Sequence, residues 1–245
     1  MSKLMTGKLV TTRRGALGSL AGLAAASAGA ARAEETSGGT AAHAVTTHLT
    51  ADEALALLRE GNANYVTDAP YRGGDTRERR MEIAEGQAPF AVLVGCSDSR
   101  VPPELLFGRG LGELFIIRVA GNTVDTAARG SVEYAVGPLG VPLVVVLGHE
   151  RCGAVQAAME VVANDATFPG HIGDMVEPIV PAVLAAQELE GDPIANAVTA
   201  NVRRVVAHVT EQSPIIREGL DQGRVKVVGA VYDLHEGQVT FLDEV

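Results

Sequence analysis

The alternation of apolar runs and amphipathic stretches along the chain predicts a sheet of buried strands joined by helices. Four apolar runs have the length of a strand, at residues 90–95, 114–119, 141–147 and 226–232. Three of the four are nearly continuous in Val, Ile and Leu, which is typical of parallel strands buried on both faces. Helical patterns at residues 124–136 and 154–162 lie between them and predict crossover helices.

Further elements complete the predicted fold. Thr50 and Glu53 form a capping box that opens a helix, and Gly61-Asn62 is predicted to close it. A long helical stretch covers roughly residues 175–220, and residues 238–242 are predicted to form a short edge strand. The sequence therefore predicts an α/β fold with a mostly parallel sheet, four parallel strands plus a short antiparallel edge strand, flanked by helices and preceded by an N-terminal helical arm.

Composition adds an acidic surface to this picture. The chain of 245 residues is 47% hydrophobic and carries a formal charge of −10. Its first 33 residues hold five basic and no acidic residues, so the remainder has fifteen basic residues against thirty acidic ones. A surface this negative repels nucleic acid and anionic lipid, which excludes both as expected partners.

The N-terminus has the pattern of an export signal. Arg13 and Arg14 precede a run rich in Ala and Gly that reaches residue 31, and a small-x-small cleavage pattern ends at Ala33. The arginine pair resembles a twin-arginine signal. A transmembrane anchor is the alternative, but the run is short and weakly hydrophobic for a membrane span. We therefore expect cleavage after Ala33, a periplasmic location and no membrane contact in the mature form.

Three segments follow from this interpretation. Residues 1–33 are the export signal peptide, and residues 34–49 are small and polar, as expected of a flexible lead-in. Residues 50–245 form a single domain that contains every predicted strand.

Polar side chains gather directly after two of the predicted strands. Cys96 follows the first strand, and His149 and Cys152 follow the third. Ligand sites in open α/β sheets form at the carboxyl ends of the strands, so these segments are expected to meet if the two strands are neighbours. Thiolate and imidazole are preferred zinc ligands, and three protein ligands leave one position open, as in catalytic zinc sites.

Several other interpretations of these residues remain. Cys96 and Cys152 can form a disulfide in an oxidising compartment, or they can be buried apolar residues. Zinc can also be structural, with Asp98 as a permanent fourth ligand. Asp98 and Arg100 lie two residues apart on an extended segment and point the same way, so the guanidinium can hold the carboxylate away from the metal. Asp98 thus has two possible partners, and it would be a metal ligand in the closed state only.

Together the two motifs resemble those of the β-class carbonic anhydrases. The motifs are Cys96-Ser97-Asp98-Ser99-Arg100 and His149-Glu150-Arg151-Cys152-Gly153, and the similarity extends from about residue 54 to residue 242. Gln87 lies where the family has an active-site glutamine. Phe115, Tyr134 and Gly153 lie at positions of the family's substrate pocket. One position departs from some bacterial members, since Leu93 stands where they bind inhibitory bicarbonate through a tryptophan.

The resemblance implies the β-carbonic anhydrase fold and reversible hydration of carbon dioxide to bicarbonate and a proton by zinc-bound hydroxide. Asp98 would orient the hydroxide, Arg100 would keep Asp98 ionised, and Gln87 would donate to the substrate. The family's pocket lies at a subunit interface, which implies a homodimer or a dimer of dimers. Two alternatives are hydrolysis of carbonyl sulfide or carbon disulfide at the same zinc, and a non-catalytic zinc- or bicarbonate-binding protein. A redox protein using both cysteines is a third.

Overall fold

A five-stranded sheet organises the part of the chain that the computed structural model describes, residues 46–69 and 74–242. The strand order is β2-β1-β3-β4-β5. The four parallel strands are β1 (Ala91–Gly95), β2 (Leu114–Arg118), β3 (Leu143–His149) and β4 (Lys226–Tyr232). The short strand β5 (Val239–Phe241) pairs antiparallel with β4 at one edge. The predicted fold class is confirmed.

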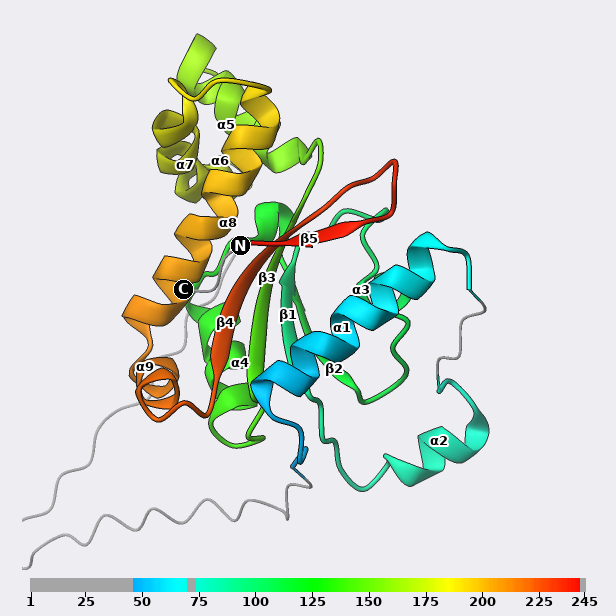
Figure 1. Cartoon of the computed structure of the whole chain (residues 1–245). Helices are drawn as coiled ribbons and strands as arrows, with labels where there is room; N and C mark the ends of the chain where they lie inside the picture. The colour runs from blue at the N-terminus through cyan, green and yellow to red at the C-terminus, as the bar shows by residue number, and fades with distance from the viewer. Residues whose placement is uncertain (1–45, 70–73, 243–245) are drawn as a thin grey trace, which may run out of the picture. The chain divides into compact units, whose positions relative to one another are not determined.

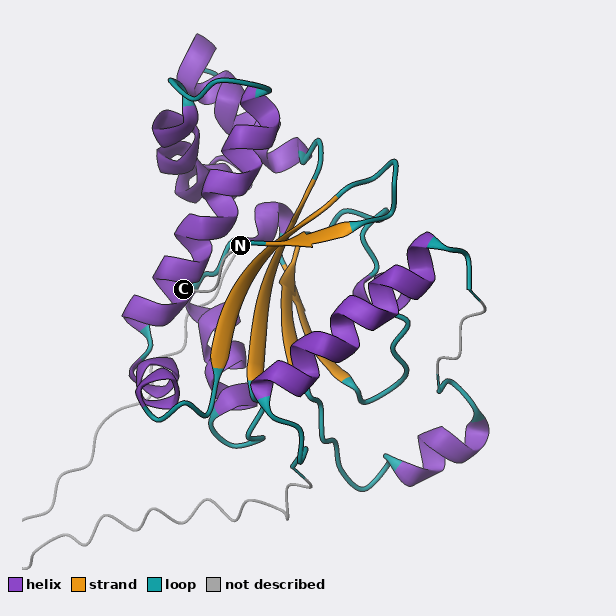
Figure 2. Cartoon of the chain, viewed as in Figure 1, coloured by secondary structure: helices purple, strands orange, loops and turns teal. Residues whose placement is uncertain are grey.

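Helices cover both faces of this sheet (Figures 1 and 2). The long helix α1 (Ala51–Val66) and the short α3 (Pro103–Leu106) pack on one face, where Leu58, Leu93 and Leu106 are fully buried. On the other face lie three helices, α4 (Thr126–Val136), α8 (Pro193–Gln212) and α9 (Pro214–Asp221). The helix α2 (Arg77–Glu82) has no buried residue.

A separate layer of helices packs near the carboxyl ends of the strands. It contains α5 (Gly153–Asn164), α6 (Ile172–Val176), the 3₁₀ turn η2 (Glu177–Ile179) and α7 (Val180–Ala186). These helices and the first half of α8 share a core that includes Cys96 and Cys152. A second 3₁₀ turn, η1 (Ala120–Asn122), follows β2 and contacts α5, β1 and β3. Both cysteines therefore lie at the junction of the sheet and this helical layer.

Burial along the strands follows the hydrophobic pattern. Every residue of β1 and β3 is buried, as predicted from their continuous apolar sequence. Most of β4 is buried as well. The residues of β2 are only partly buried, because this strand forms the edge of the sheet opposite β5.

One predicted helix boundary is wrong. Gly61-Asn62 does not end α1, which continues to Val66. Gly61 is needed for close packing, since a Cβ there would lie 1.9 Å from the carbonyl oxygen of Phe107. The side-chain amide of Asn62 donates to the carbonyl oxygens of Leu106 and Gly237. Tertiary contacts therefore explain two residues that local propensity assigned to a helix end.

The helical stretch predicted at residues 175–220 is interrupted. Gly191, with a φ of 106°, and the N-cap Asp192 separate α7 from α8. Ser213 caps α9, and Pro214 begins it. A proline lacks the amide that would continue the preceding helix.

The third predicted strand, at residues 141–147, is displaced along the chain, because β3 begins at Leu143 and extends to His149.

The predicted export signal, residues 1–33, lies outside the described residues, as does most of the lead-in at 34–49. The predicted start of the folded domain at Thr50 coincides with the N-cap of α1. None of the helices in residues 46–69 and 74–242 has the length and apolar character needed to cross a membrane.

Candidate metal centre

The register of two adjacent strands brings the predicted ligands together. β1 and β3 are parallel neighbours, and Gly95 pairs with Leu147. Cys96 follows β1 directly, and His149 is the last residue of β3. Cys152 is the N-cap of α5, and Arg151, with a φ of 52°, reverses the chain between them. Strand order and one tight turn thus bring residues that are distant in the sequence together at one site.

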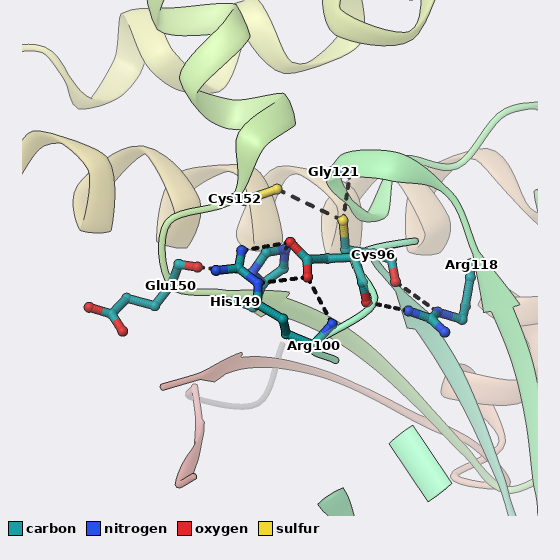
Figure 3. Close-up of polar contacts among 8 residues, drawn as sticks. Cys96, Arg100, Arg118, Gly121, His149, Glu150 and Cys152 are labelled. Carbon is teal, nitrogen blue, oxygen red and sulfur yellow. Dashed lines mark hydrogen bonds and ion pairs between the residues drawn. The ribbon is translucent and has the colours of Figure 1, made fainter. Parts of the chain in front are cut away.

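Cys96, His149 and Cys152 form a compact group of potential ligands (Figure 3). All three residues are buried, and their ligand atoms lie within 4.8 Å of one another. The two Sγ atoms are 4.0 Å apart and both cysteines are free, so they do not form the alternative disulfide. Two sulfurs bound tetrahedrally at about 2.3 Å from one zinc ion lie ~3.8 Å apart. The spacing of the sulfurs therefore fits zinc.

His149 has the tautomer that a metal ligand needs. Its Nδ1 lies 2.9 Å from the carbonyl oxygen of Glu150, which can only accept, so Nδ1 carries the proton. Nε2 then presents its lone pair, and this atom is buried without a hydrogen-bond partner. A fully buried polar atom without a partner is costly unless something binds it. The carbonyl of Glu150 is the orienting acceptor typical of metal-bound histidines.

The two thiols lie in contact and shift each other's pKa in opposite directions. The contact with Cys152, together with His149 and the amide of Gly121, lowers the pKa of Cys96 to about 4 against the effect of burial. The same contact and burial raise the pKa of Cys152. The Gly121 amide donates to Cys96 Sγ over 3.3 Å. A bound dication would favour the thiolate form of both, because metal binding releases thiol protons.

Asp98 is held by Arg100 in a two-pronged contact. Arg100 Nε donates to Oδ1 over 2.9 Å, and Nη2 donates to Oδ2 over 2.7 Å. The backbone amide of Arg100 also donates to Oδ1. The guanidinium holds the pKa of Asp98 well below its usual range. Oδ2 lies 3.9 Å from His149 Nε2, so Asp98 stays close to the ligand group while its oxygens are occupied by Arg100.

Arg118 supports the same loop from β2. Its Nε donates to the carbonyl oxygen of Cys96 over 2.8 Å, and Nη2 donates to that of Asp98 over 2.5 Å. The turn η1 is held by α8, where the side-chain amide of Asn201 donates to the carbonyl oxygen of Gly121. Sequence reasoning did not assign roles to Arg118, Gly121, Asn201 or the Glu150 carbonyl. Arg118 and Gly121 lie at the carboxyl end of the second predicted strand, and that position is the signal that could have found them.

The remaining predicted site residues do not join this group within one chain. Gln87 is exposed and precedes β1, whereas Cys96 follows that strand. Five strand residues at about 3.3 Å each separate them by roughly 17 Å. Phe115 and Tyr134 contact each other with ring centroids 6.4 Å apart, and 51% of Tyr134 is exposed. Only Gly153, at the start of α5, lies beside a ligand.

Leu93, the position where some family members have a tryptophan, is fully buried on the α1 face of the sheet. Its side chain offers no polar group. The predicted departure from the bicarbonate-binding pattern therefore corresponds to an ordinary core position.

Comparisons with known proteins point to one family. The family model described as "Carbonic anhydrase" matches residues 91–239. Carbonic anhydrase 2 of Mycobacterium tuberculosis is 40% identical over 189 residues, which cover 77% of this chain and 91% of the relative. The carbonic anhydrase of Mycolicibacterium smegmatis is 39% identical over 182 residues, covering 74% and 88%.

Solved structures agree with these relatives. A tetrameric β-carbonic anhydrase of Sordaria macrospora aligns with a TM-score of 0.61 and 27% identity, covering 67% of this chain and 86% of that one. A Coccomyxa β-carbonic anhydrase in complex with acetazolamide aligns with a TM-score of 0.59 and 29% identity, covering 67% and 77%. With the ligand group at the ends of β1 and β3, these matches show that the chain belongs to the β-class carbonic anhydrases.

Proposed function

We propose that the chain binds one zinc ion through Cys96, His149 and Cys152 and catalyses the reversible hydration of carbon dioxide. The observation that carries this proposal is the pair of hydrogen bonds that Arg100 donates to the carboxylate of Asp98. It leaves three protein ligands for the metal, and a fourth tetrahedral position for water is the arrangement of a catalytic zinc site. A structural zinc site would instead need a fourth protein ligand.

The residues around the metal would divide the remaining work. A zinc ion held by Cys96, His149 and Cys152 would supply a bound water of lowered pKa, as in carbonic anhydrases generally. Asp98, kept ionised by Arg100, would accept a hydrogen bond from the attacking water and orient its lone pair toward carbon dioxide. The Glu150 carbonyl keeps the proton of His149 on Nδ1. The Gly121 amide stabilises negative charge on Cys96.

Metal content and hydration rate, measured on the same preparations, test this proposal. We expect one zinc per chain and fast hydration in stopped-flow assays. Cys152→Ala should lose both, whereas Ser97→Ala, an exposed position in the same loop, should keep both. Zinc without hydration would favour the zinc- or bicarbonate-binding alternative. Hydrolysis of carbonyl sulfide measured in parallel separates that substrate from carbon dioxide.

We further propose that a second subunit supplies Gln87, Phe115 and Tyr134 to each metal centre. Within one chain Gln87 lies at the opposite end of β1 from Cys96, and the exposed Tyr134 is available to a partner. The Sordaria relative is tetrameric, which supports an assembly with subunit interfaces. A homodimer or a dimer of dimers satisfies this requirement.

Subunit mixing tests the shared site. Gln87→Ala and Cys152→Ala should each reduce hydration in the homo-oligomer. When the two variants are mixed and allowed to exchange subunits, a mixed dimer contains one site with both native residues, so activity should recover. A mixture no more active than the sum of its components would show that Gln87 does not act across the interface.

Finally, we propose export to the periplasm by the signal in residues 1–33. The arginine pair and the Ala33 cleavage pattern support it. Replacing Arg13 and Arg14 together by lysine keeps the charge but should retain the uncleaved chain in the cytoplasm. Lys3→Arg and Lys8→Arg, which also conserve charge, should leave export unchanged. Fractionation and the mass of the mature chain measure the outcome.

A further inference from the structure

A second polar cavity lies outside the metal centre, between α4, α8 and η2. Its volume is about 310 Å³. The cavity is lined by Thr123, Val124, Asp125, Thr126, Arg129, Pro178, Arg204, Val205 and His208. We call it the cation pocket because Arg129, Arg204 and His208 line it together. None of its residues belongs to the metal centre or to the positions assigned to the substrate pocket.

Two of these cations lack partners for part of their hydrogen-bonding capacity. Arg129 donates through Nη2 to His208 Nε2 over 2.9 Å, but its Nε is buried without a hydrogen-bond partner. Within residues 46–69 and 74–242, Arg204 makes neither a hydrogen bond nor an ion pair. Because arginine has donors and no acceptor, the buried Nε of Arg129 can be satisfied only by an acceptor that this part of the chain does not provide. Arg204 is exposed, so its donors are free to bind a ligand at the mouth of the pocket.

The charge balance of the pocket is positive. Arg129 and Arg204 contribute two positive charges, and His208 is neutral because its Nε2 accepts from Arg129. Asp125 is the only acidic residue of the lining, and one of its oxygens caps α4 by accepting from the amide of Ala128 over 2.7 Å. The positive end of α4 also faces this region. A net positive lining contrasts with thirty acidic residues in the chain.

We propose that the cation pocket binds a small oxyanion, either phosphate itself or the phosphate or carboxylate group of a small organic molecule. Arginine guanidinium groups match the geometry of such oxygens and bind them through paired hydrogen bonds. The apolar side chains of Val124, Pro178 and Val205 line the rest of the cavity. An adjoining hollow of about 500 Å³ shares Arg204 and His208 and gives room for the organic part of a larger ligand.

His208 reports on the charge of the pocket. Burial, followed by the charges of Arg129 and Arg204, lowers its pKa, while Glu211 acts in the opposite direction. An oxyanion between the two guanidinium groups would offset their charge, and the pKa of His208 would rise. This readout follows binding directly. The shift in the His208 pKa depends neither on the metal nor on hydration activity. Phosphate binding can therefore be absent while the proposed hydration is present, and hydration can be absent while phosphate binds.

The first experiment is an NMR titration of the histidine rings in the zinc-loaded mature protein, with and without inorganic phosphate. Chloride keeps the ionic strength constant. Phosphate should raise the midpoint of the His208 titration by about 1 pH unit, the effect of one opposite charge at close range. His171, whose side chain is 99% exposed, should not change. His208→Gln identifies the signal by removing it.

Matched variants locate the effect. Arg204→Gln should weaken phosphate binding by about 10- to 100-fold, the typical loss for one charged hydrogen-bonding group. Arg203→Gln removes another exposed arginine one residue away on α8, outside the pocket lining, and should bind phosphate as the native chain does. Arg129→Lys keeps the charge but loses the planar fork, so it should also weaken binding. Neither arginine lies in the metal centre, and hydration should be unchanged.

Two results would overturn the proposal. One is a His208 midpoint that does not respond to phosphate at tens of millimolar. The other is an equal loss of binding in Arg203→Gln and Arg204→Gln, which would indicate only a general effect of charge. The source of the anion is distinguished by competition: a small phosphorylated or carboxylated molecule that displaces phosphate at lower concentration indicates an organic ligand. Displacement by none of them indicates inorganic phosphate.

Discussion

The metal centre and the cation pocket share one segment of chain yet are built in different ways. Gly121 of η1 donates to Cys96 in the metal centre, and Thr123, two residues further on, lines the cation pocket. The three potential metal ligands are buried, and strand register brings Cys96 and His149 together. The arginines of the pocket project from helices, and Arg204 is exposed. Strand ends thus provide a rigid ligand set, whereas helix faces provide a site that long side chains can adjust.

The two sites also select opposite charges. Two thiols and the ionised Asp98 gather where a cation is expected, and two guanidinium groups gather where an anion is expected. α8 touches both regions, because Asn201 donates to Gly121 and Arg204 and His208 follow on the same helix. Separate residues on neighbouring elements therefore set the charge preference of each site. Variants that separate or couple them test this conclusion.

The largest effect is expected at Asp98. Asp98→Asn keeps the shape but cannot carry the negative charge that Arg100 stabilises, so kcat/KM for hydration should fall by about 10²- to 10⁴-fold, as for loss of a general acid–base group. Zinc content and phosphate binding should stay unchanged. Stopped-flow hydration and metal analysis measure this. A loss of zinc in this variant would instead make Asp98 a permanent ligand.

Gly121→Ala should affect both sites, because it distorts the turn η1 that borders them. Gly121 has a φ of 72°, and a Cβ there would lie 2.5 Å from Ile179 Cδ1 and 3.1 Å from the Cβ of Ala154. The free energy of unfolding should fall by about 2–4 kcal/mol through overpacking and backbone strain. Urea denaturation measures it. Gly130→Ala is the control, since a Cβ at this helical position meets nothing within 4 Å and should be neutral or stabilising.

Asn201→Ala should have a smaller effect on both regions. The Asn201 amide donates to the carbonyl oxygen of Gly121 over 2.9 Å, and the residue is buried. Removing it leaves that carbonyl without this donor and should cost about 1–3 kcal/mol of unfolding free energy. Thr199→Ala, on the exposed side of α8, provides the comparison. Equal stability of the two variants would contradict a structural role for this link.

The smallest effect concerns pH and the cation pocket alone. The pKa of His208 is lower in the folded chain than its ordinary value of 6.5, so the unfolded chain binds more protons between the folded pKa and 6.5. Stability must therefore rise with pH across this window and decrease as the pH falls through it. His208→Gln should reduce this dependence without changing stability at pH 8. Thermal unfolding at several pH values measures the difference.

The predictability of the two sites from sequence follows from how each is built. Cys96, His149 and Cys152 lie in motifs at the ends of predicted apolar strands, so periodicity together with the position of strand ends predicted that they would meet, and they do. The cation pocket has no such motif, because Arg129 and His208 are 79 positions apart on helices whose packing the sequence does not show. The prediction that Gly61 ends a helix was wrong for a related reason. Gly61 is needed because the backbone of Phe107, a distant residue, packs against it.

Local signals succeeded where the cause is local. The capping box of Thr50 and Glu53 is present, with both reciprocal hydrogen bonds. The pairing of Asp98 with Arg100 is also present and two-pronged, as their spacing predicted. The positions of Gln87 and Tyr134 relative to a metal remain a prediction, because their role depends on a second subunit.

The placement of the ligands on β1 and β3 has a consequence for how the chain assembles. Cys96 and His149 are brought together only when the two central strands have paired, and the intervening segment contains β2 and α4. A metal ion bound by these residues would close this long loop and stabilise the pairing of β1 with β3, since it would gain its ligands only in the folded chain. Removing the ion should therefore destabilise the pairing of β1 with β3 and the packing of the helices against them. The ion should bind only after these two strands have paired.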